Sequence, residues 1–172
     1  FEKHTTHFSA ADAAGNWVSC TSTINTSYGS KVVVPGMGVV LNNEMDDFAA
    51  EAGAPNAFGL VGAEANLPAP GKRPLSSMSP TLVFEGERPV LAIGAAGGPT
   101  IISQTLLALL HILDEGDTPA QALARPRFHQ QWSPDELRVE KSMPSALKDD
   151  LRRRGHVLKE VDIIGSTQAV GQ

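Results

Sequence analysis

Apolar and polar positions alternate along the first quarter of the chain, and a period of two is typical of β-strands with two unlike faces. The clearest case is residues 17–24, where apolar or small side chains alternate with hydroxyls. Shorter apolar runs bounded by turn residues predict further strands. The strands predicted in the first half are residues 7–12, 17–24, 32–34, 38–41, 81–84 and 89–93.

The second half of the chain changes to a helical pattern. Residues 101–113 are apolar nearly all round, which predicts a helix buried on most of its sides. Thr118 followed by Pro119 predicts the start of a short second helix. A third helix is expected after residues 142–144, with Gly155 as its stop.

Two final strands are predicted at residues 156–164 and 167–170, so the order is strands, helices and strands. In a chain of 172 residues of which 41% are hydrophobic, this order predicts one layered α+β domain. Residues 42–79 form a long irregular stretch, and a loop of that length within a domain is usually functional or disordered.

Composition excludes several classes of protein. Asp and Glu outnumber Lys and Arg by 19 to 14, and the net charge of −5 argues against a nucleic-acid partner, which needs a basic face. Cys20 stands alone, so neither an intrachain disulfide nor a cysteine metal cage can form. Metalloprotease, dinucleotide-binding and Walker motifs are absent from the sequence, and we expect neither a metal nor a cofactor.

Four polar clusters carry candidate chemistry. The first is Thr5-Thr6-His7, because a Thr hydroxyl becomes nucleophilic beside a base, and the α-amine of a chain-terminal Thr can be that base. The alternative is a purely structural role, in which Thr5 and Thr6 are ordinary β-branched residues at the start of a strand. The second cluster is the hydroxyl-rich segment 21–29, which could equally be a solvated strand face with an Asn turn.

The third cluster lies at residues 41–48 and holds Glu44, Asp46 and Asp47 at the end of an apolar strand. These carboxylates could bind a cation, either Ca²⁺ or a substrate ammonium. Because the regular acidic spacing of an EF-hand is missing, an ammonium is at least as good a fit. The alternative is a solvated acidic turn.

The fourth cluster comprises Ser76 and Ser77, which can donate hydrogen bonds to a carboxylate, and Gly97-Gly98 before a predicted helix. Backbone N–H groups at such a position can bind an anion or form an oxyanion hole. Together the four clusters offer a nucleophile, an ammonium site, a carboxylate site and an oxyanion site. These are the parts needed to handle an α-amino acid group attached to a reacting acyl carbon.

In this order the clusters resemble the small, catalytic subunit of γ-glutamyltransferase (γ-glutamyl transpeptidase). The two most specific strings are Asn42-Asn43-Glu44-Met45-Asp46-Asp47-Phe48 and Pro74-Leu75-Ser76-Ser77-Met78. Further matching strings follow the family's order along nearly the whole chain: Thr5-Thr6-His7-Phe8-Ser9, Thr21-Ser22-Thr23-Ile24-Asn25, Gly94-Ala95-Ala96-Gly97-Gly98, Pro126-Arg127-Phe128-His129 and Gly165-Ser166-Thr167-Gln168.

The resemblance implies the α+β fold of N-terminal nucleophile hydrolases, an αββα four-layer sandwich of which this chain would supply the small-subunit portion. It also implies a zymogen that cuts itself before the nucleophilic Thr into a large and a small subunit that stay together. The autocatalytic cleavage would fall between His4 and Thr5. Residues 1–4 would then be a remnant upstream of the junction, and residues 5–172 the catalytic portion, truncated at its C-terminus.

By the same resemblance, Thr5 would attack the γ-carbonyl of glutathione or another γ-glutamyl compound. The γ-glutamyl ester would then pass to water or to the amine of an amino acid or dipeptide acceptor. Thr23 would orient Thr5, and the N–H groups of Gly97 and Gly98 would form the oxyanion hole.

The resemblance assigns the substrate's α-ammonium to Asn25, Glu44 and Asp47, and its α-carboxylate to Ser76 and Ser77. Residues 51–63 match a loop that lids the site in some members. Phe58 stands there where Tyr is common, and since Phe cannot donate a hydrogen bond to Asn25, an apolar gate is expected.

Other implications concern parts beyond these motifs. The family's carboxylate-binding Arg lies in the large subunit, so it has no counterpart among these motifs. Family members are usually exported, which implies a periplasmic, extracellular or membrane-associated location, although this chain carries no signal peptide.

Two alternatives stay open. A cephalosporin (glutaryl) acylase shares the ancestry, but its substrate lacks the α-ammonium, so the acidic cluster argues against it. The chain could also be an inactive fragment that acts only as the assembly partner of a large subunit.

Overall fold

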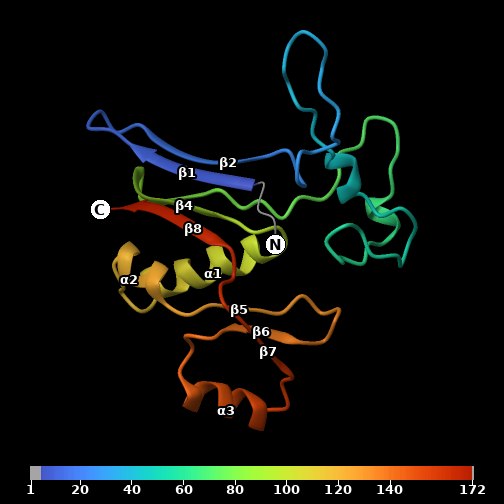
Figure 1. Ribbon diagram of the computed structural model, residues 1–172. Helices are drawn as coiled ribbons and strands as arrows, with labels where there is room; N and C mark the ends of the chain where they lie inside the picture. Colours follow the sequence, from blue (N-terminus) through green and yellow to red (C-terminus); the bar gives the residue numbers. More distant parts are fainter. Residues whose placement is uncertain (1–4, 172) are drawn as a thin grey trace.

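The computed structural model describes residues 5–171, so the predicted cleavage remnant, residues 1–4, lies outside the described residues. The described chain forms eight strands, three α-helices and two short 3-10 helices (Figure 1). In chain order the strands and α-helices are β1 (Thr5–Ala11), β2 (Trp17–Thr23), β3 (Thr81–Glu85), β4 (Arg88–Ala96), α1 (Thr100–Leu113), α2 (Pro119–Ala124), β5 (Phe128–His129), β6 (Leu137–Glu140), α3 (Ser145–Arg153), β7 (Leu158–Val161) and β8 (Ser166–Gly171).

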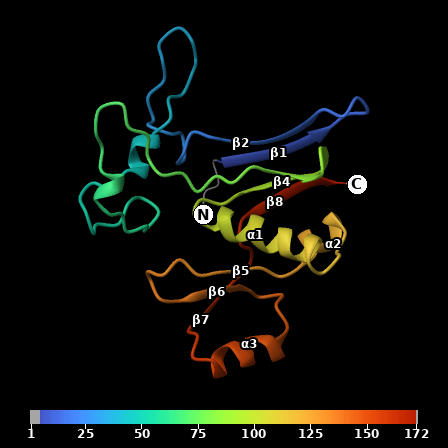
Figure 2. The same cartoon turned by 180° about the vertical axis from the view of Figure 1, so that it is seen from behind.

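Two β-layers and one helical layer are stacked in the part of the molecule that contains β1 and β8 (Figures 1 and 2). β1 and β2 form an antiparallel pair in which Thr5 lies opposite Thr23. The second sheet has the order β3-β4-β8 and is antiparallel throughout. β1 and β2 contact β4 on one side of this sheet. On the other side α1 contacts β4 and β8, and α2 contacts β8. Residues 5–171 thus supply three layers of the predicted αββα sandwich.

A third, smaller sheet lies beyond α1, with the order β5-β6-β7 (Figure 1). β6 and β7 are parallel, and α3 connects them as a crossover helix. A core of Leu137, Val139 and Met143 packs there against Leu151 of α3 and Leu158 of β7. No strand was predicted at β5 and β6, which have only two and four residues.

β4 is the strand around which the main core forms. Its residues from Leu91 to Ala96 are buried, as expected of a strand covered on both faces. Leu91 and Ile93 pack with Ala108 of α1 in one buried cluster. Near the end of β4, Gly94 lies against the ring of His7 in β1, and the start of α1 lines the same pocket as Thr5, the first residue of β1.

Helix α1 is more exposed than the sequence predicted. The buried side chains of α1 include Ile101 and Ala108, which belong to the face toward the sheet. On another face, four apolar side chains are 42–55% exposed: Ile102, Leu106, Leu110 and Leu113. The prediction of a helix buried on most sides is therefore wrong only for this one stripe, because β4, β8, α2 and β5 contact the other sides of α1 and none of the described residues covers the stripe.

The predicted strands at residues 32–34 and 38–41 are also wrong. They form the two limbs of a protruding hairpin, joined by a single bridge between Val33 and Val40. The long irregular stretch at residues 42–79 is confirmed, and it contains the 3-10 helices Glu44–Asp47 and Glu64–Asn66. The final predicted strands are confirmed as β7 and β8, the first being shorter than expected.

The predicted start of α2 is confirmed. Thr118 is its N-cap, Pro119 is its first residue, and the Gln121 N–H donates to Thr118 Oγ1 at 3.3 Å. None of the helices within residues 5–171 has the length and apolar character needed to cross a membrane.

Candidate active site

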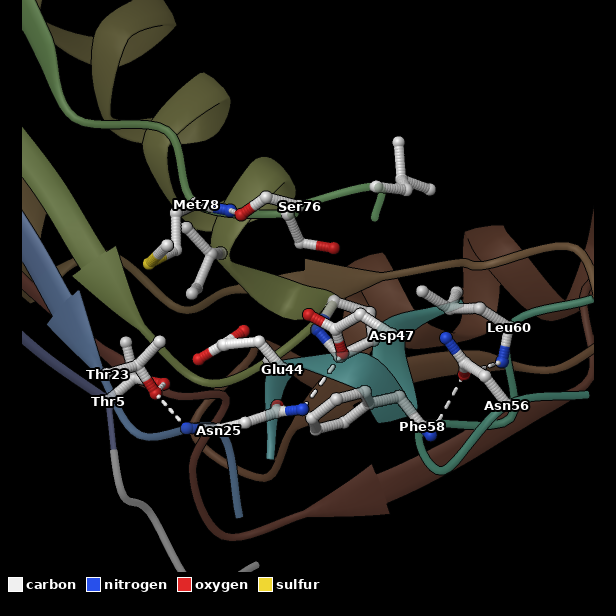
Figure 3. Close-up of a pocket in the computed structure, with 15 residues that line it drawn as sticks. Thr5, Thr23, Asn25, Glu44, Asp47, Asn56, Phe58, Leu60, Ser76 and Met78 are labelled. Atoms are coloured by element: carbon white, nitrogen blue, oxygen red, sulfur yellow. Dashed lines mark hydrogen bonds between the residues drawn. The ribbon is translucent and has the colours of Figure 1, made fainter. Parts of the chain in front are cut away.

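A pocket opens where the start of β1 and the ends of β2 and β4 meet the irregular stretch 42–79 (Figure 3). Eight of the nine site residues predicted from the sequence line it: Thr5, Thr23, Asn25, Glu44, Asp47, Ser76, Ser77 and Gly98. The ninth, Gly97, directly precedes Gly98 in the chain and lines a second cavity. Segments far apart in the sequence therefore meet at one place.

The Thr5 hydroxyl is oriented by the register of the first hairpin. Thr5 opens β1 and Thr23 closes β2 directly opposite it. Thr5 Oγ1 donates a hydrogen bond of 3.0 Å to Thr23 Oγ1. Thr23 Oγ1 also accepts the backbone N–H of Asn25 at 2.8 Å. The Thr23 side chain is thus held from one side while it holds the Thr5 hydroxyl on the other.

Asn25 turns the chain from β2 toward the acidic segment. Its φ of 78° lies in the left-handed region, which Asn tolerates better than most residues. Its side chain is buried, and Nδ2 donates to the carbonyl of Asn43 at 3.1 Å and to Asp47 Oδ1 at 3.2 Å. Asn25 therefore ties the nucleophile strand to the 3-10 helix that carries the carboxylates.

Glu44 and Asp47 place two carboxyl groups in the pocket. Burial raises the pKa of Glu44, and the nearby charge of Asp47 raises it further. Burial also raises the pKa of Asp47, although the hydrogen bond from Asn25 opposes that rise. Glu44 Oε1 is buried without a hydrogen-bond partner among the described residues. A bound cation would favour the ionised form of both carboxyls and would give the unpaired Glu44 oxygen a partner.

The third carboxylate of the acidic cluster has a local role. Asp46 Oδ2 accepts a hydrogen bond of 2.6 Å from Asn43 Nδ2. Asn43 Oδ1 in turn accepts the backbone N–H of Thr26 at 3.0 Å. Asn43 belongs to one of the matching motifs, and its residue type alone indicates no function. In the structure its side chain braces the turn that carries Asn25.

The Gly97-Gly98 turn directs backbone N–H groups away from helix α1. The carbonyl of Gly97 accepts Thr100 Oγ1 at 2.9 Å, and the carbonyl of Ala96 accepts Gln104 Nε2 at 3.2 Å. In a trans peptide the N–H points opposite to the C=O, so the N–H groups of Gly98 and Gly97 point away from these side chains. Gly98 lines the pocket at the N-terminal end of α1, where the helix dipole favours negative charge.

Ser76 and Ser77 lie on the extended segment that precedes β3. In Figure 3, Ser76 and Met78 form the wall across the pocket from Glu44 and Asp47. Ser76 Oγ accepts the N–H of Met78 at 3.2 Å, which leaves its own hydroxyl hydrogen for another acceptor. The pocket therefore has an acidic wall and a hydroxyl wall.

Phe58 forms a further part of the lining, from the predicted lid at residues 51–63. Its ring lies against the glycine turn, since a Cβ on Gly98 would be 3.3 Å from Phe58 Cδ1. The Phe58 carbonyl accepts Gln131 Nε2 at 3.5 Å, a long hydrogen bond from the loop after β5. The contact at the pocket is apolar, as expected for Phe in this position.

His7 supports Thr5 from within the sandwich. It follows Thr5 by two residues on β1, so both side chains belong to the same face. Its ring is buried, with Nδ1 at 2.7 Å from Thr21 Oγ1 and Nε2 at 3.0 Å from Ser9 Oγ. Burial lowers the pKa of His7, which favours a neutral imidazole. Gly94 makes room, because a Cβ there would be 2.3 Å from His7 Cε1.

One other side-chain cluster within residues 5–171 has metal-ligand types. His111, Glu115 and Asp117 bring their ligand atoms together at the end of α1. The Arg125 guanidinium contacts both carboxylates, at 3.2 Å from Glu115 and 2.8 Å from Asp117. It also lowers the pKa of Asp117. An internal cation therefore already neutralises this cluster.

Comparisons with known proteins agree with this site. The profile of the family described as Gamma-glutamyltranspeptidase matches residues 2–172. The glutathione hydrolase proenzyme of Escherichia coli is 47% identical over 167 residues, which is 96% of this chain but only 29% of that protein. The chain thus spans under a third of the length of that curated relative.

Two solved structures place the fold. A mutant of Helicobacter pylori gamma-glutamyltranspeptidase is 46% identical with a TM-score of 0.92, over 96% of this chain and 90% of that one. A cephalosporin acylase from Bacillus halodurans is more distant, at 26% identity and a TM-score of 0.83, over 96% of this chain and 30% of that one. The predicted α+β sandwich portion is confirmed by these likenesses.

Proposed function

The chain belongs to the gamma-glutamyltranspeptidase family, and from that premise we propose that it is the catalytic portion of a γ-glutamyltransferase that also hydrolyses glutathione. One observation carries the proposal. The unpartnered Glu44 oxygen and the Asp47 carboxyl lie in the same pocket as the Thr5–Thr23 hydroxyl pair. A cation site beside a nucleophile suits a substrate that carries an α-ammonium group near a reacting acyl carbon.

Maturation makes the nucleophile in this proposal. Thr5 Oγ attacks the carbonyl carbon of His4, the peptide becomes an ester, and water cleaves that ester to free the Thr5 amine. The junction lies at the edge of the described residues, with residues 1–4 as the upstream remnant and residues 5–172 as the catalytic portion. The 3.0 Å hydrogen bond to Thr23 supports this step, because it fixes the hydroxyl that attacks.

The first half-reaction acylates Thr5. The freed α-amine takes the hydroxyl proton while Thr5 Oγ attacks the γ-carbonyl of the donor. The N–H groups of Gly97 and Gly98 stabilise the oxyanion, and the departing amine, which is cysteinylglycine for glutathione, takes the proton. The N–H groups of Gly97 and Gly98 point away from α1, and this orientation supports their role in the oxyanion hole.

The second half-reaction empties the site. Water, an amino acid or a dipeptide amine attacks the γ-glutamyl ester, and Thr5 recovers its proton. Attack by water gives hydrolysis and attack by an amine gives transfer. Both proceed through the same oxyanion.

Donor binding uses the two opposite walls of the pocket. The α-ammonium binds Glu44, Asp47 and Asn25, and the α-carboxylate binds Ser76 and Ser77. This arrangement favours a γ-glutamyl donor over a glutaryl one, because a glutaryl group would leave the half-buried carboxyls without a cation. The alternative of a cephalosporin acylase has one likeness in its favour, at 26% identity against 46% for the gamma-glutamyltranspeptidase structure.

The proposal includes a large subunit from the same precursor. The chain covers 90% of the Helicobacter pylori polypeptide but only 29% of the Escherichia coli proenzyme. Lengths that differ this much fit a precursor that is cut into two chains. The second alternative, an inactive fragment, would be such a portion without catalysis. An exported location completes the proposal, as is usual in the family.

The test compares two chromogenic donors on the full-length precursor after maturation. We expect γ-glutamyl-p-nitroanilide to be cleaved much faster than glutaryl-p-nitroanilide, and Thr5→Ala to abolish both cleavage of the precursor and turnover. A preference for the glutaryl compound would favour the acylase. Normal turnover by Thr5→Ala would exclude Thr5 as the nucleophile.

A further inference from the structure

A hairpin of aliphatic residues projects from the molecule between β2 and the acidic segment. We call residues 31–41 the arm; it is the protruding blue loop of Figures 1 and 2. Five of its aliphatic side chains are 43–73% exposed: Val32, Val33, Met37, Val39 and Leu41. Exposed apolar patches of this kind mark interaction sites in natural proteins.

The arm is an ordered element. The Val34 N–H donates to the Val39 carbonyl at 2.8 Å, and the Leu41 N–H donates to the Val32 carbonyl at 2.9 Å. At the base of the arm the backbone at residue 29 lies so close to Leu41 that only glycine fits, because a Cβ on Gly29 would be 2.2 Å from the Leu41 carbonyl oxygen. Backbone hydrogen bonds hold these exposed side chains in a fixed pattern.

Both faces of the arm are apolar. Neighbouring residues in an extended limb point to opposite faces, and Val32 and Val33 are each 53% exposed. Lys31, at the base, is the only charged residue between residues 26 and 43. A surface β-hairpin ordinarily keeps a polar face toward water. An arm without one fits a partner that encloses it from two sides.

We propose that the arm inserts into an apolar cleft of the large-subunit portion of the precursor and holds the two chains together. This inference rests on the proposed two-subunit function. In the Escherichia coli relative, more than two thirds of the length lies outside the match. A large-subunit portion of that size is big enough to enclose the arm. A second copy of this chain fits less well, since pairing of two arms covers one face of each and leaves the other in water.

The arm also leads directly into the donor site. Its last residue, Leu41, precedes Asn42 and Asn43, and the Glu44 N–H donates to Asn42 Oδ1 at 3.0 Å. The Asn43 N–H donates to the Ile24 carbonyl at 3.3 Å. The base of the arm is therefore continuous with the segment on which the Glu44 and Asp47 carboxyls stand.

The first experiment places a photoreactive benzoylphenylalanine at position 37, the tip of the arm, in the full-length precursor. After maturation and irradiation we expect a cross-link from this position to a peptide of the large-subunit portion. A cross-link to a second copy of this chain, or no cross-link in a two-chain complex, would overturn the inference. The same probe at Val157, which is 68% exposed away from the arm, should remain unlinked.

Substitutions test the energetic role. We expect Val33→Asp and, at the tip, Met37→Asp to speed dissociation of the two chains at least tenfold, with Val157→Asp as the matched control within twofold. Unchanged dissociation in both arm variants would refute the docking role. Turnover of γ-glutamyl-p-nitroanilide by the wild type separates the two claims. If the enzyme is active and has two chains but the arm forms no cross-link, only the inference about the arm is refuted. If there is neither turnover nor a second chain, the proposed function is refuted as well.

Discussion

Replacing Thr23 with Val tests whether the hydroxyl pair at the strand ends prepares the nucleophile. Val matches the shape of Thr but cannot accept the hydrogen bonds from Thr5 Oγ1, at 3.0 Å, and from the Asn25 N–H, at 2.8 Å. Each bond contributes about 0.5–1.5 kcal/mol net, so the free energy of unfolding should fall by about 1–3 kcal/mol. The bond to Thr5 alone carries about 1 kcal/mol of that sum.

The effect on rate should exceed the value of one bond, because the hydroxyl also loses its orientation. A barrier increase of about 1.4–2.7 kcal/mol corresponds to about a 10- to 100-fold fall in rate. We expect this fall in both precursor cleavage and kcat, with a smaller rise in KM because Thr23 touches the ammonium site only through Asn25. Thr23→Ser retains the accepting oxygen and should stay within about threefold of the wild type.

The assay follows precursor cleavage by gel and turnover of γ-glutamyl-p-nitroanilide by absorbance. Denaturant unfolding of the same variants gives the stability term. If Thr23→Val cleaves itself and turns over within twofold of the wild type, the orienting role is wrong. Equal losses in Thr23→Val and Thr23→Ser would also refute it, because packing and not the oxygen would then be responsible.

Further predictions concern the pocket walls. The pKa of Glu44 is raised in the folded protein, so its ionisation costs folding stability once the pH exceeds the pKa of Glu44 in the unfolded chain. Glu44→Gln should therefore raise the free energy of unfolding of the donor-free enzyme. The same substitution should raise the donor KM about tenfold. Donor kcat/KM should decline as the pH falls through the raised pKa values of Glu44 and Asp47, beginning at a higher pH than for ordinary carboxyls; a flat profile above their usual range would contradict this. Gly98→Ala should lower kcat more than tenfold, because φ is +60° and the new Cβ would lie 3.3 Å from the Phe58 ring; a normal kcat would argue against the glycine turn as oxyanion site. Gln131→Ala should speed hydrogen exchange of the backbone around Phe58 without changing exchange in β4, and equal exchange in the two proteins would show that the 3.5 Å bond does not restrain the lid.

The sequence predicted the site better than the packing around it. Residues such as Thr5, Glu44 and Gly98 stand in local motifs whose chemistry can be interpreted from residue type, and the fold brings these three into one pocket. The outcome for helix α1 was different. Its apolar pattern predicts burial on most sides, but burial depends on what lies against each face, and Leu106 and Leu110 have no such cover within residues 5–171.

Contacts that form only on folding explain the other differences. Gly97 and Gly98 are adjacent in sequence, yet only Gly98 faces the pocket, because the Gly97 carbonyl is held by Thr100. Nothing in the sequence indicates that His7 requires the empty space at Gly94, since β1 and β4 meet only after folding. The hydrogen-bonding chemistry of a motif can be predicted from its residues, whereas the residues that pack around the motif depend on tertiary structure.

The central claim is that Thr5 is the nucleophile of a γ-glutamyl enzyme. Its most direct measurement is peptide mapping by mass spectrometry of the mature full-length enzyme, quenched in acid during turnover of a γ-glutamyl donor. We predict a new chain that begins at Thr5 and a γ-glutamyl ester on that residue, absent after treatment with hydroxylamine. A γ-glutamyl group on any other residue, or steady turnover by an enzyme whose His4–Thr5 bond is intact, would contradict the account.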